Sequence, residues 1–116
     1  MRFESQIRDG VCILRLHGRF VAGSDAELAS AQDSLQEAGI AKAILDLRNV
    51  PYIDSTGLAF VVDLHKSLAR NGGQLFLADA NRRVREVLRL TRIGEIIPLF
   101  DDVEEAEAAF RAEVLC

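Results

Sequence analysis

The apolar residues of this chain follow two spacings, one typical of strands and the other typical of amphipathic helices. Short apolar or alternating runs predict strands over residues 3–8, 11–17, 43–47, 74–78 and 96–100. Apolar residues three and four apart predict helices over about 24–39, about 55–70 and 81–90, and from 101 or 102 onward. Strands that alternate with helices after an opening hairpin predict an α/β fold. We expect a single domain with a mixed, mostly parallel central sheet of four to five strands and about four helices.

Turn and capping residues mark the expected ends of these elements. Asp9-Gly10 predicts a tight hairpin turn, because both residue types tolerate the backbone conformations of such a turn. Ser24 and Glu27 match a capping box at the start of the first helix. Pro98 places the last strand at a sheet edge, since proline has no N–H to donate. The expected stops of the first three helical segments are Gly39, Asn71-Gly72-Gly73 and Gly94.

The helical stripes predict which side chains face the sheet. The first stripe comprises Leu28, Ala31, Leu35 and Ala38. The second comprises Leu58, Val61, Val62, His65, Leu68 and Ala69, and the last comprises Val103, Ala106, Ala109 and Phe110. Side chains alternate along a strand, so Val11 and Ile13 are expected on one face of the sheet and Cys12 and Leu14 on the other.

Composition and charge narrow the functional classes. A chain of 116 residues suits one domain, taken to span 1–116, and 49% hydrophobic residues exclude general disorder. The net charge of −4 argues against direct nucleic-acid binding, which needs a basic surface. No apolar run approaches the roughly 20 residues that span a bilayer, so no membrane insertion is expected. The polar start lacks a signal peptide, and two cysteines fit a reducing compartment, so a cytoplasmic location is expected.

The sequence Asp54-Ser55-Thr56-Gly57 is the main candidate for chemistry. It lies between a buried strand and a helix start, where ligand sites of α/β domains are found. One interpretation is helix capping, since Asp, Ser and Thr are favoured at this position. The other is a functional site, because a helix N-terminus tolerates a phosphate on Ser or Thr. The two interpretations are compatible.

Other chemistries fit the residues poorly. A serine hydrolase would need a base near Ser55, but His65 lies ten residues along the same helix, about 15 Å away. His17 ends a strand and could in principle approach Ser55, but the Gly-x-Ser-x-Gly pattern is absent, and His17 is expected at the surface. Asp46 could be the phospho-acceptor of a receiver domain, but the strand 11–17 ends without the carboxylates such a site needs for Mg²⁺. No metal-ligand spacing or glycine-rich phosphate cradle is present, so no cofactor is expected.

The third predicted helix is strongly basic. Its region contains Arg82, Arg83, Arg85, Arg89 and Arg92. The favoured interpretation is a solvated helix face, and the alternative is a contact with an acidic partner. The acidic residues at the start of the last helix suit the helix dipole and need no further function. Cys12 is expected to be a buried small hydrophobe, and Cys116 an exposed thiol.

Three stretches resemble a known family. They are LDLRNVPYIDSTGL, RNGGQLFLA, and VREVLRLTRIGEIIPLF followed by an acidic, Ala-rich helix. With LHGRF, they resemble the STAS domain over nearly the whole chain, in the form found in bacterial anti-sigma factor antagonists. The resemblance implies a switch protein and not an enzyme.

The resemblance also implies a mechanism and a site. In such antagonists the serine after the motif aspartate, here Ser55, is phosphorylated by a partner anti-sigma factor that is an ATP-dependent serine kinase. The unphosphorylated form binds the kinase and so frees a sigma factor for transcription, and a phosphoserine phosphatase resets the phosphorylated form. The implied partner-binding residues are Asp54, Ser55, Thr56, Gly57 and Leu58.

The chain departs from the family pattern at three positions. Val21 stands where members often have an acidic residue, Thr56 replaces the commoner serine, and Ala59 stands where glycine is common. The same domain also occurs in transport systems. The alternative function is therefore a cytoplasmic STAS subunit of a membrane assembly that transports lipids or anions.

Overall fold

The computed structural model describes residues 2–18 and 25–115. For residues 25–28, 31 and 113–115 it describes the backbone alone. Its strands are β1 (Arg2–Arg8), β2 (Val11–His17), β3 (Lys42–Asn49), β4 (Gln74–Ala78) and β5 (Leu99–Phe100). Its helices are α1 (Asp25–Glu37), α2 (Ser55–Arg70), α3 (Arg82–Leu90), α4 (Ile93–Ile96) and α5 (Val103–Leu115). The predicted Ser24 cap, Cys116 and the Val21 position lie outside the described residues.

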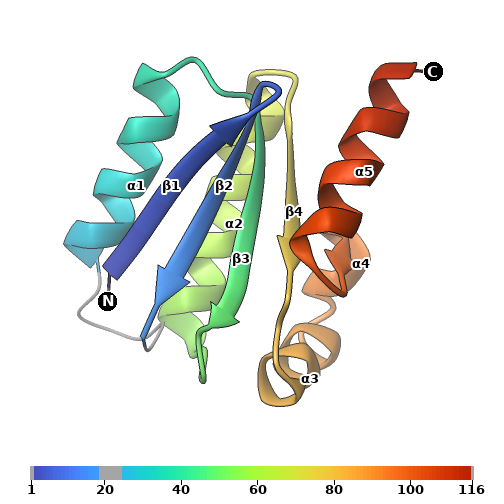
Figure 1. Ribbon diagram of the computed structural model, residues 1–116. Helices are drawn as coiled ribbons and strands as arrows, with labels where there is room; N and C mark the ends of the chain where they lie inside the picture. The colour runs from blue at the N-terminus through green and yellow to red at the C-terminus, as the bar shows by residue number, and fades with distance from the viewer. Residues whose placement is uncertain (1, 19–24, 116) are drawn as a thin grey trace.

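The five strands form one sheet in the order β1-β2-β3-β4-β5 (Figure 1). β1 and β2 are antiparallel and pair from Arg2 opposite His17 to Arg8 opposite Val11, while the other neighbours are parallel. Asp9 and Gly10 have φ angles of 53° and 78°, the left-handed values that a two-residue hairpin turn requires. The predicted α/β fold with a mostly parallel sheet and an opening hairpin is confirmed.

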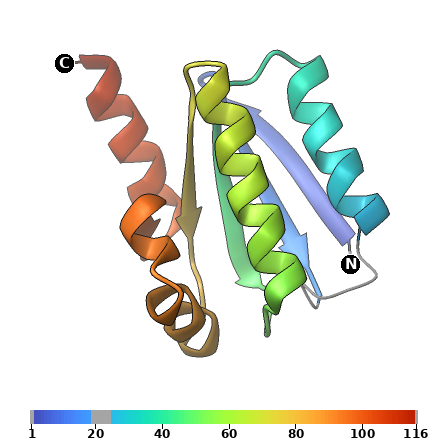
Figure 2. The same ribbon diagram turned by 180° about the vertical axis from the view of Figure 1, so that it is seen from behind.

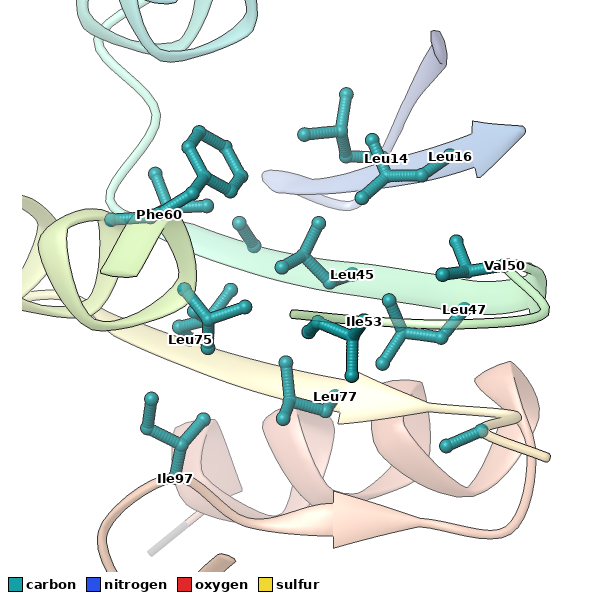
Figure 3. Close-up of a cluster of buried hydrophobic side chains, with 14 of the residues drawn as sticks. Leu14, Leu16, Leu45, Leu47, Val50, Ile53, Phe60, Leu75, Leu77 and Ile97 are labelled. Atoms are coloured by element: carbon teal, nitrogen blue, oxygen red, sulfur yellow. The ribbon is translucent and has the colours of Figure 1, made fainter. Parts of the chain in front are cut away.

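Two hydrophobic clusters lie on opposite faces of the sheet. The larger one joins β2, β3 and β4 to α1, α2 and α3, and Figure 3 shows it around Leu45, Leu75 and Phe60. The smaller one joins Ile44 and Phe76 to α5, where the rings of Phe76 and Phe110 stack with centroids 4.0 Å apart. Figures 1 and 2 show α1 and α2 on one face and α5 on the other.

The predicted alternation of side chains is confirmed in β2. Cys12 and Leu14 belong to the larger cluster, whereas Val11 and Ile13 belong to the smaller one. The inward stripe of α5 is also confirmed, since Val103, Ala106 and Phe110 are buried and Ala109 is partly buried.

The second helical stripe was predicted only in part. Val61 and Leu68 are buried as expected, whereas Ala69 is exposed and Leu58, Val62 and His65 are only partly buried. The buried face of α2 consists of Gly57, Phe60, Val61, Leu64, Ser67 and Leu68. Apolar residues occur almost all round this helix, so the packing against the sheet fixes the buried face and the spacing alone does not.

The segment after α3 differs most from the prediction. Thr91 caps α3, its Oγ1 donating to the carbonyl oxygen of Val87 at 2.8 Å, and Arg92 has a φ of 63°. Gly94 therefore lies inside the short helix α4 and does not end α3, and β5 begins only at Leu99.

In α1, Leu35 is buried as predicted, but Ala38 lies beyond the end of the helix and is exposed. In the part of the chain that is described, no helix has the length and apolar character to cross a membrane.

Candidate functional site

The candidate site lies at the edge of the sheet where the parallel strands end. From β3 the chain continues through Val50 and Ile53, both buried in the larger cluster, to the start of α2. Asn81, the N-cap of α3, donates from Nδ2 to the carbonyl oxygens of Val50 and Pro51, each at 3.3 Å. The segment before α2 is therefore held both by its own apolar side chains and by α3.

Asp54 is the N-cap of α2. Its Oδ1 accepts hydrogen bonds from the amides of Thr56 at 2.9 Å and Gly57 at 3.2 Å, and its carbonyl oxygen accepts one from the amide of Leu58 at 2.9 Å. This arrangement satisfies amides in the first turn that have no partner within the helix. The capping interpretation of the motif is confirmed for Asp54, which leaves Ser55 outside the capping role.

Ser55 is the first residue of α2, and its side chain is exposed. Its hydroxyl makes no hydrogen bond to any residue that the structure describes. Thr56 and Leu58 are partly buried, and Gly57 is buried. Of the five residues predicted for the site, Ser55 thus offers the most accessible nucleophilic oxygen, while the backbone of Gly57 serves the cap.

A shallow hollow lies beside Ser55, between α1 and α2. Its lining residues are Ala29, Gln32, Ser55, Thr56, Ala59, Phe60 and Asp63. The hollow is open to solvent, and Ser55 is one of the residues that line it. A chemical change at Ser55 would therefore alter this surface.

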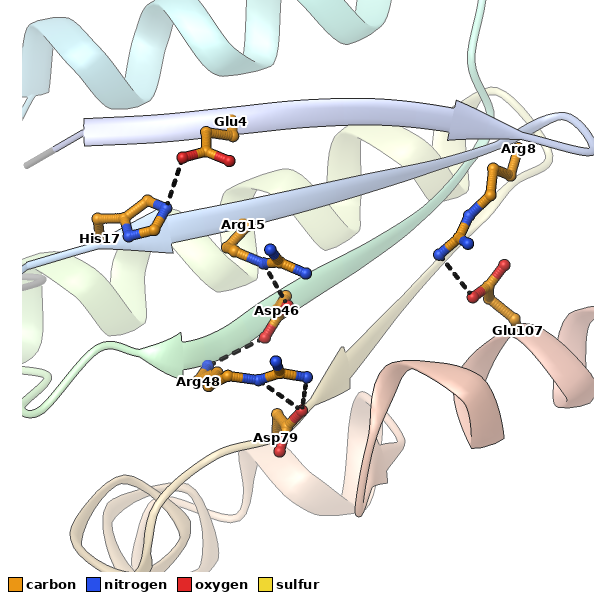
Figure 4. Close-up of polar contacts among 8 residues, drawn as sticks. All are labelled: Glu4, Arg8, Arg15, His17, Asp46, Arg48, Asp79 and Glu107. Atoms are coloured by element: carbon orange, nitrogen blue, oxygen red, sulfur yellow. Dashed lines mark hydrogen bonds and ion pairs between the residues drawn. The ribbon is translucent and has the colours of Figure 1, made fainter.

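Asp46 has a structural role that the sequence did not reveal. Its side chain is fully buried; Oδ2 accepts from Arg15 Nε at 2.8 Å and Oδ1 accepts from the amide of Arg48 at 3.0 Å (Figure 4). Arg48 in turn donates from Nη2 to Asp79 at 2.9 Å, a contact that raises the pKa of the Arg48 guanidinium. A carboxylate that is already engaged by two donors fits an anchor between β2 and β3 better than a phospho-acceptor.

The structure places both histidines in partly buried positions. His17, predicted at the surface, is partly buried, and its Nε2 lies 3.0 Å from Glu4 Oε1 on β1 (Figure 4). His65 is partly buried on α2, and its Nδ1 has no hydrogen-bond partner among the described residues. Among those residues, no group of three His, Cys, Asp or Glu side chains is placed to hold a metal ion.

The comparison with known protein families agrees with this fold and with the helix-start motif. The family model of the STAS domain matches residues 2–106, so the chain belongs to the STAS domain family. The chain is 27% identical over 116 residues to the anti-sigma F factor antagonist of Paenibacillus polymyxa, covering 99% of this chain and 97% of that protein. It is 35% identical over 104 residues to BtrV of Bordetella bronchiseptica, a provisionally named anti-sigma factor antagonist, covering 89% of each.

Solved structures agree with this assignment. A provisionally named anti-sigma factor antagonist from Thermotoga maritima superposes with a TM-score of 0.88 at 30% identity, covering 94% of each chain. The unphosphorylated form of the anti-sigma factor antagonist SpoIIAA shares the fold, with a TM-score of 0.81 at 18% identity and coverage of 96% of this chain and 97% of that one. A sulfate transporter family protein from Wolinella succinogenes gives a TM-score of 0.78 at 26% identity, covering 96% and 93%. The resemblance that the sequence motifs indicated is confirmed.

Proposed function

We propose that this chain is an anti-sigma factor antagonist whose binding is switched by phosphorylation of Ser55. The observation that carries the proposal is the exposed Ser55 side chain directly after the Asp54 cap, in a chain similar to proteins named anti-sigma factor antagonists. The unphosphorylated chain binds an anti-sigma factor with serine kinase activity and frees a sigma factor for transcription. A phosphoserine phosphatase restores the binding form. The chain acts as one STAS domain in the cytoplasm, as a binding protein without catalysis of its own.

The geometry around Ser55 explains how a phosphate would act there. A phosphate adds about −1.5 to −2 charges at neutral pH. The amides of Thr56 and Gly57, which would otherwise receive an anion, already donate to Asp54. The phosphate would therefore lie beside a carboxylate with these two donors occupied, and it would project toward the partner. Inside an interface, its desolvation and its repulsion of like charge weaken binding without unfolding the domain.

The partner surface in this proposal is the start of α2 with the hollow beside it. Asp54, Ser55, Thr56 and Leu58 present side chains at or near the surface, and Gly57 allows close packing beneath them. A loss of about 1.4 kcal/mol in binding free energy lowers the affinity tenfold. A single phosphate at the rim of this surface is therefore sufficient for a switch.

Paired baits test the proposal. Ser55→Ala and Ser55→Asp chains are used to capture proteins from the cytosol of the native host, with Ser5→Ala and Ser5→Asp as a matched pair at an exposed serine of β1. We expect a small ATP-binding kinase on the Ser55→Ala bait and on both Ser5 baits, and its loss from the Ser55→Asp bait. Incubation of the wild-type chain with that kinase and ATP should place a phosphate on Ser55, as located by mass spectrometry. Equal capture of the kinase by all four baits would contradict the switch.

The second candidate is a cytoplasmic subunit of a membrane transport assembly for lipids or anions. The observation that favours it is the similarity to the sulfate transporter family protein of Wolinella succinogenes. In the same capture experiment, this function predicts transporter subunits on the Ser55→Ala and Ser55→Asp baits alike. The Asp54–Gly57 motif would then act only as a helix cap.

A further inference from the structure

A second hollow lies on the other side of the segment that leads into α2. Its lining residues are Tyr52, Ile53, Arg82, Arg83, Glu86 and Val87, and we call it the Tyr52 groove. Tyr52 is 42% exposed, and the guanidinium carbon of Arg83 lies 5.8 Å from the centroid of its ring. Figure 2 shows α3 at the same edge of the sheet as the start of α2. The groove and Ser55 therefore lie at the same edge of the domain.

The groove continues as an apolar stripe along α3. Arg83, Val87 and Leu90 are four and three residues apart, so they lie on one face of the helix. Val87 is partly buried, whereas Leu90 is 67% exposed. Tyr52 and Leu90 are two of the four large hydrophobic residues that are exposed in the described part of the chain. Val87 lines the groove, and Leu90 extends the same face of α3 by one turn. Exposed apolar side chains beside a hollow are typical of a protein contact surface.

The charge of α3 is opposite in sign to the net charge of the whole chain. The nine residues of α3 contain four arginines and one glutamate, whereas the whole chain has a net charge of −4. Arg85 is paired with Asp101, and Arg89 is paired with Glu86. Arg82 and Arg83, which line the groove, make no ion pair with any described residue. Two uncompensated cations beside an apolar stripe match an acidic partner segment that carries apolar side chains.

We propose that the Tyr52 groove docks an acidic, amphipathic segment of the protein partner. The identity of that partner rests on the proposed function, but the chemistry of the groove does not. Asn81 couples the groove to the site, because it caps α3 and holds the carbonyl oxygens of Val50 and Pro51 just before Tyr52. An acidic segment bound here would pass close to the start of α2. A phosphate on Ser55 would then repel the segment as well as the surface that Ser55 itself contacts.

The test uses a defined probe and no kinase. The probe is a synthetic amphipathic peptide with leucines at helical spacing and glutamates elsewhere, and its control has lysine at every glutamate position. Each peptide is titrated into the full ¹⁵N-labelled chain, and amide chemical shifts are followed by NMR. We expect the acidic peptide to shift the amides of Tyr52, Arg83, Val87 and Leu90, and to bind more tightly than the basic one.

Charge-reversal variants locate the contact. Arg82→Glu/Arg83→Glu should weaken binding of the acidic peptide about tenfold. Lys66→Glu/Arg70→Glu is the matched control, because it makes the same change in net charge on exposed residues of α2. Thermal unfolding checks that both variants fold. Equal binding of the two peptides, shifts that map away from the groove, or an equal loss in both variants would overturn the proposal. The Ser55 bait experiment contains neither variant, so the two proposals can fail separately.

Discussion

The carboxylate of Asp46 on β3 accepts a hydrogen bond of 2.8 Å from Arg15 Nε on β2, and the Asp46 side chain is completely buried. Removing this charge leaves the Arg15 guanidinium without its anion and the amide of Arg48 with a weaker acceptor. Because hydrogen bonds to charged groups contribute about 1.5–3 kcal/mol, we expect Asp46→Asn to lower the free energy of unfolding by about 2 kcal/mol in urea titrations. Asp63→Asn, at an exposed position of α2, is the control and should change the free energy of unfolding little. Equal stability of the two variants would show that the buried pair contributes nothing.

The cap of α2 leads to a second prediction, which is independent of the first. Asp54→Ala removes the acceptor of the Thr56 and Gly57 amides, so it should destabilise the domain by about 1 kcal/mol. Asp54→Asn retains a capping oxygen without the charge and should recover most of that loss. Thermal or urea unfolding compares the three proteins. A full loss in the Asn variant would mean that the charge of Asp54, and not its capping geometry, stabilises α2.

The bounds of α2 could be predicted because the signals that set them are local. Asp54 caps the helix through amides two and three residues away, and the Asn71-Gly72-Gly73 turn ends it. The predicted helix over about 55–70 therefore matches Ser55–Arg70. The end of α3 was not predictable in this way. It depends on a threonine cap and on a left-handed conformation at Arg92, a residue type that rarely adopts one.

Of the candidate site, only the motif at the start of α2 could be predicted from the sequence. Ser55 and its neighbours are adjacent in the sequence, and the structure confirms that they start a helix, which follows β3 after a short loop. The pair of Arg15 and Asp46 was missed, because the two residues are 31 positions apart and meet only through the register of β2 and β3. The Tyr52 groove was likewise missed, since it depends on Asn81 holding α3 against the segment before α2.

Cys12 provides a test of burial that does not depend on partners. Burial raises the pKa of its thiol, although a backbone hydrogen bond from Gln6 opposes this in part. Less thiolate then forms at a given pH, so the thiol should react slowly with Ellman's reagent at mildly alkaline pH. In a Cys116→Ser background, we expect reaction only at the rate of unfolding or opening, and complete reaction in denaturant. Rapid labelling of the folded protein would contradict the burial of Cys12.

The same pKa shift predicts a pH dependence of stability. The folded pKa of Cys12 is raised, so its stabilising contribution is complete below the unfolded pKa and is lost as the pH rises through the folded value. Stability should therefore fall with rising alkalinity more steeply in the wild type than in Cys12→Ala. Urea midpoints of the two proteins at neutral and alkaline pH measure the difference. Parallel pH profiles would mean that the pKa of the thiol is the same in the folded and the unfolded protein.

Gly73 has no room for a side chain, so even alanine should disturb the fold at this position. A Cβ atom there would lie 1.7 Å from the carbonyl oxygen of Ala41, an overlap with backbone that no side-chain movement relieves. That same oxygen accepts a hydrogen bond from the amide of Gln74 at 2.9 Å, so displacing it would disturb the start of β4. We expect Gly73→Ala to destabilise the domain by at least about 2 kcal/mol, measured as a lower urea midpoint.

Gly94→Ala is the matched control, because a Cβ there meets nothing closer than 4.0 Å and alanine favours the helix α4. The control should be as stable as the wild type or up to about 1 kcal/mol more stable, and equal behaviour of the two variants would show that the contact at Ala41 is not tight.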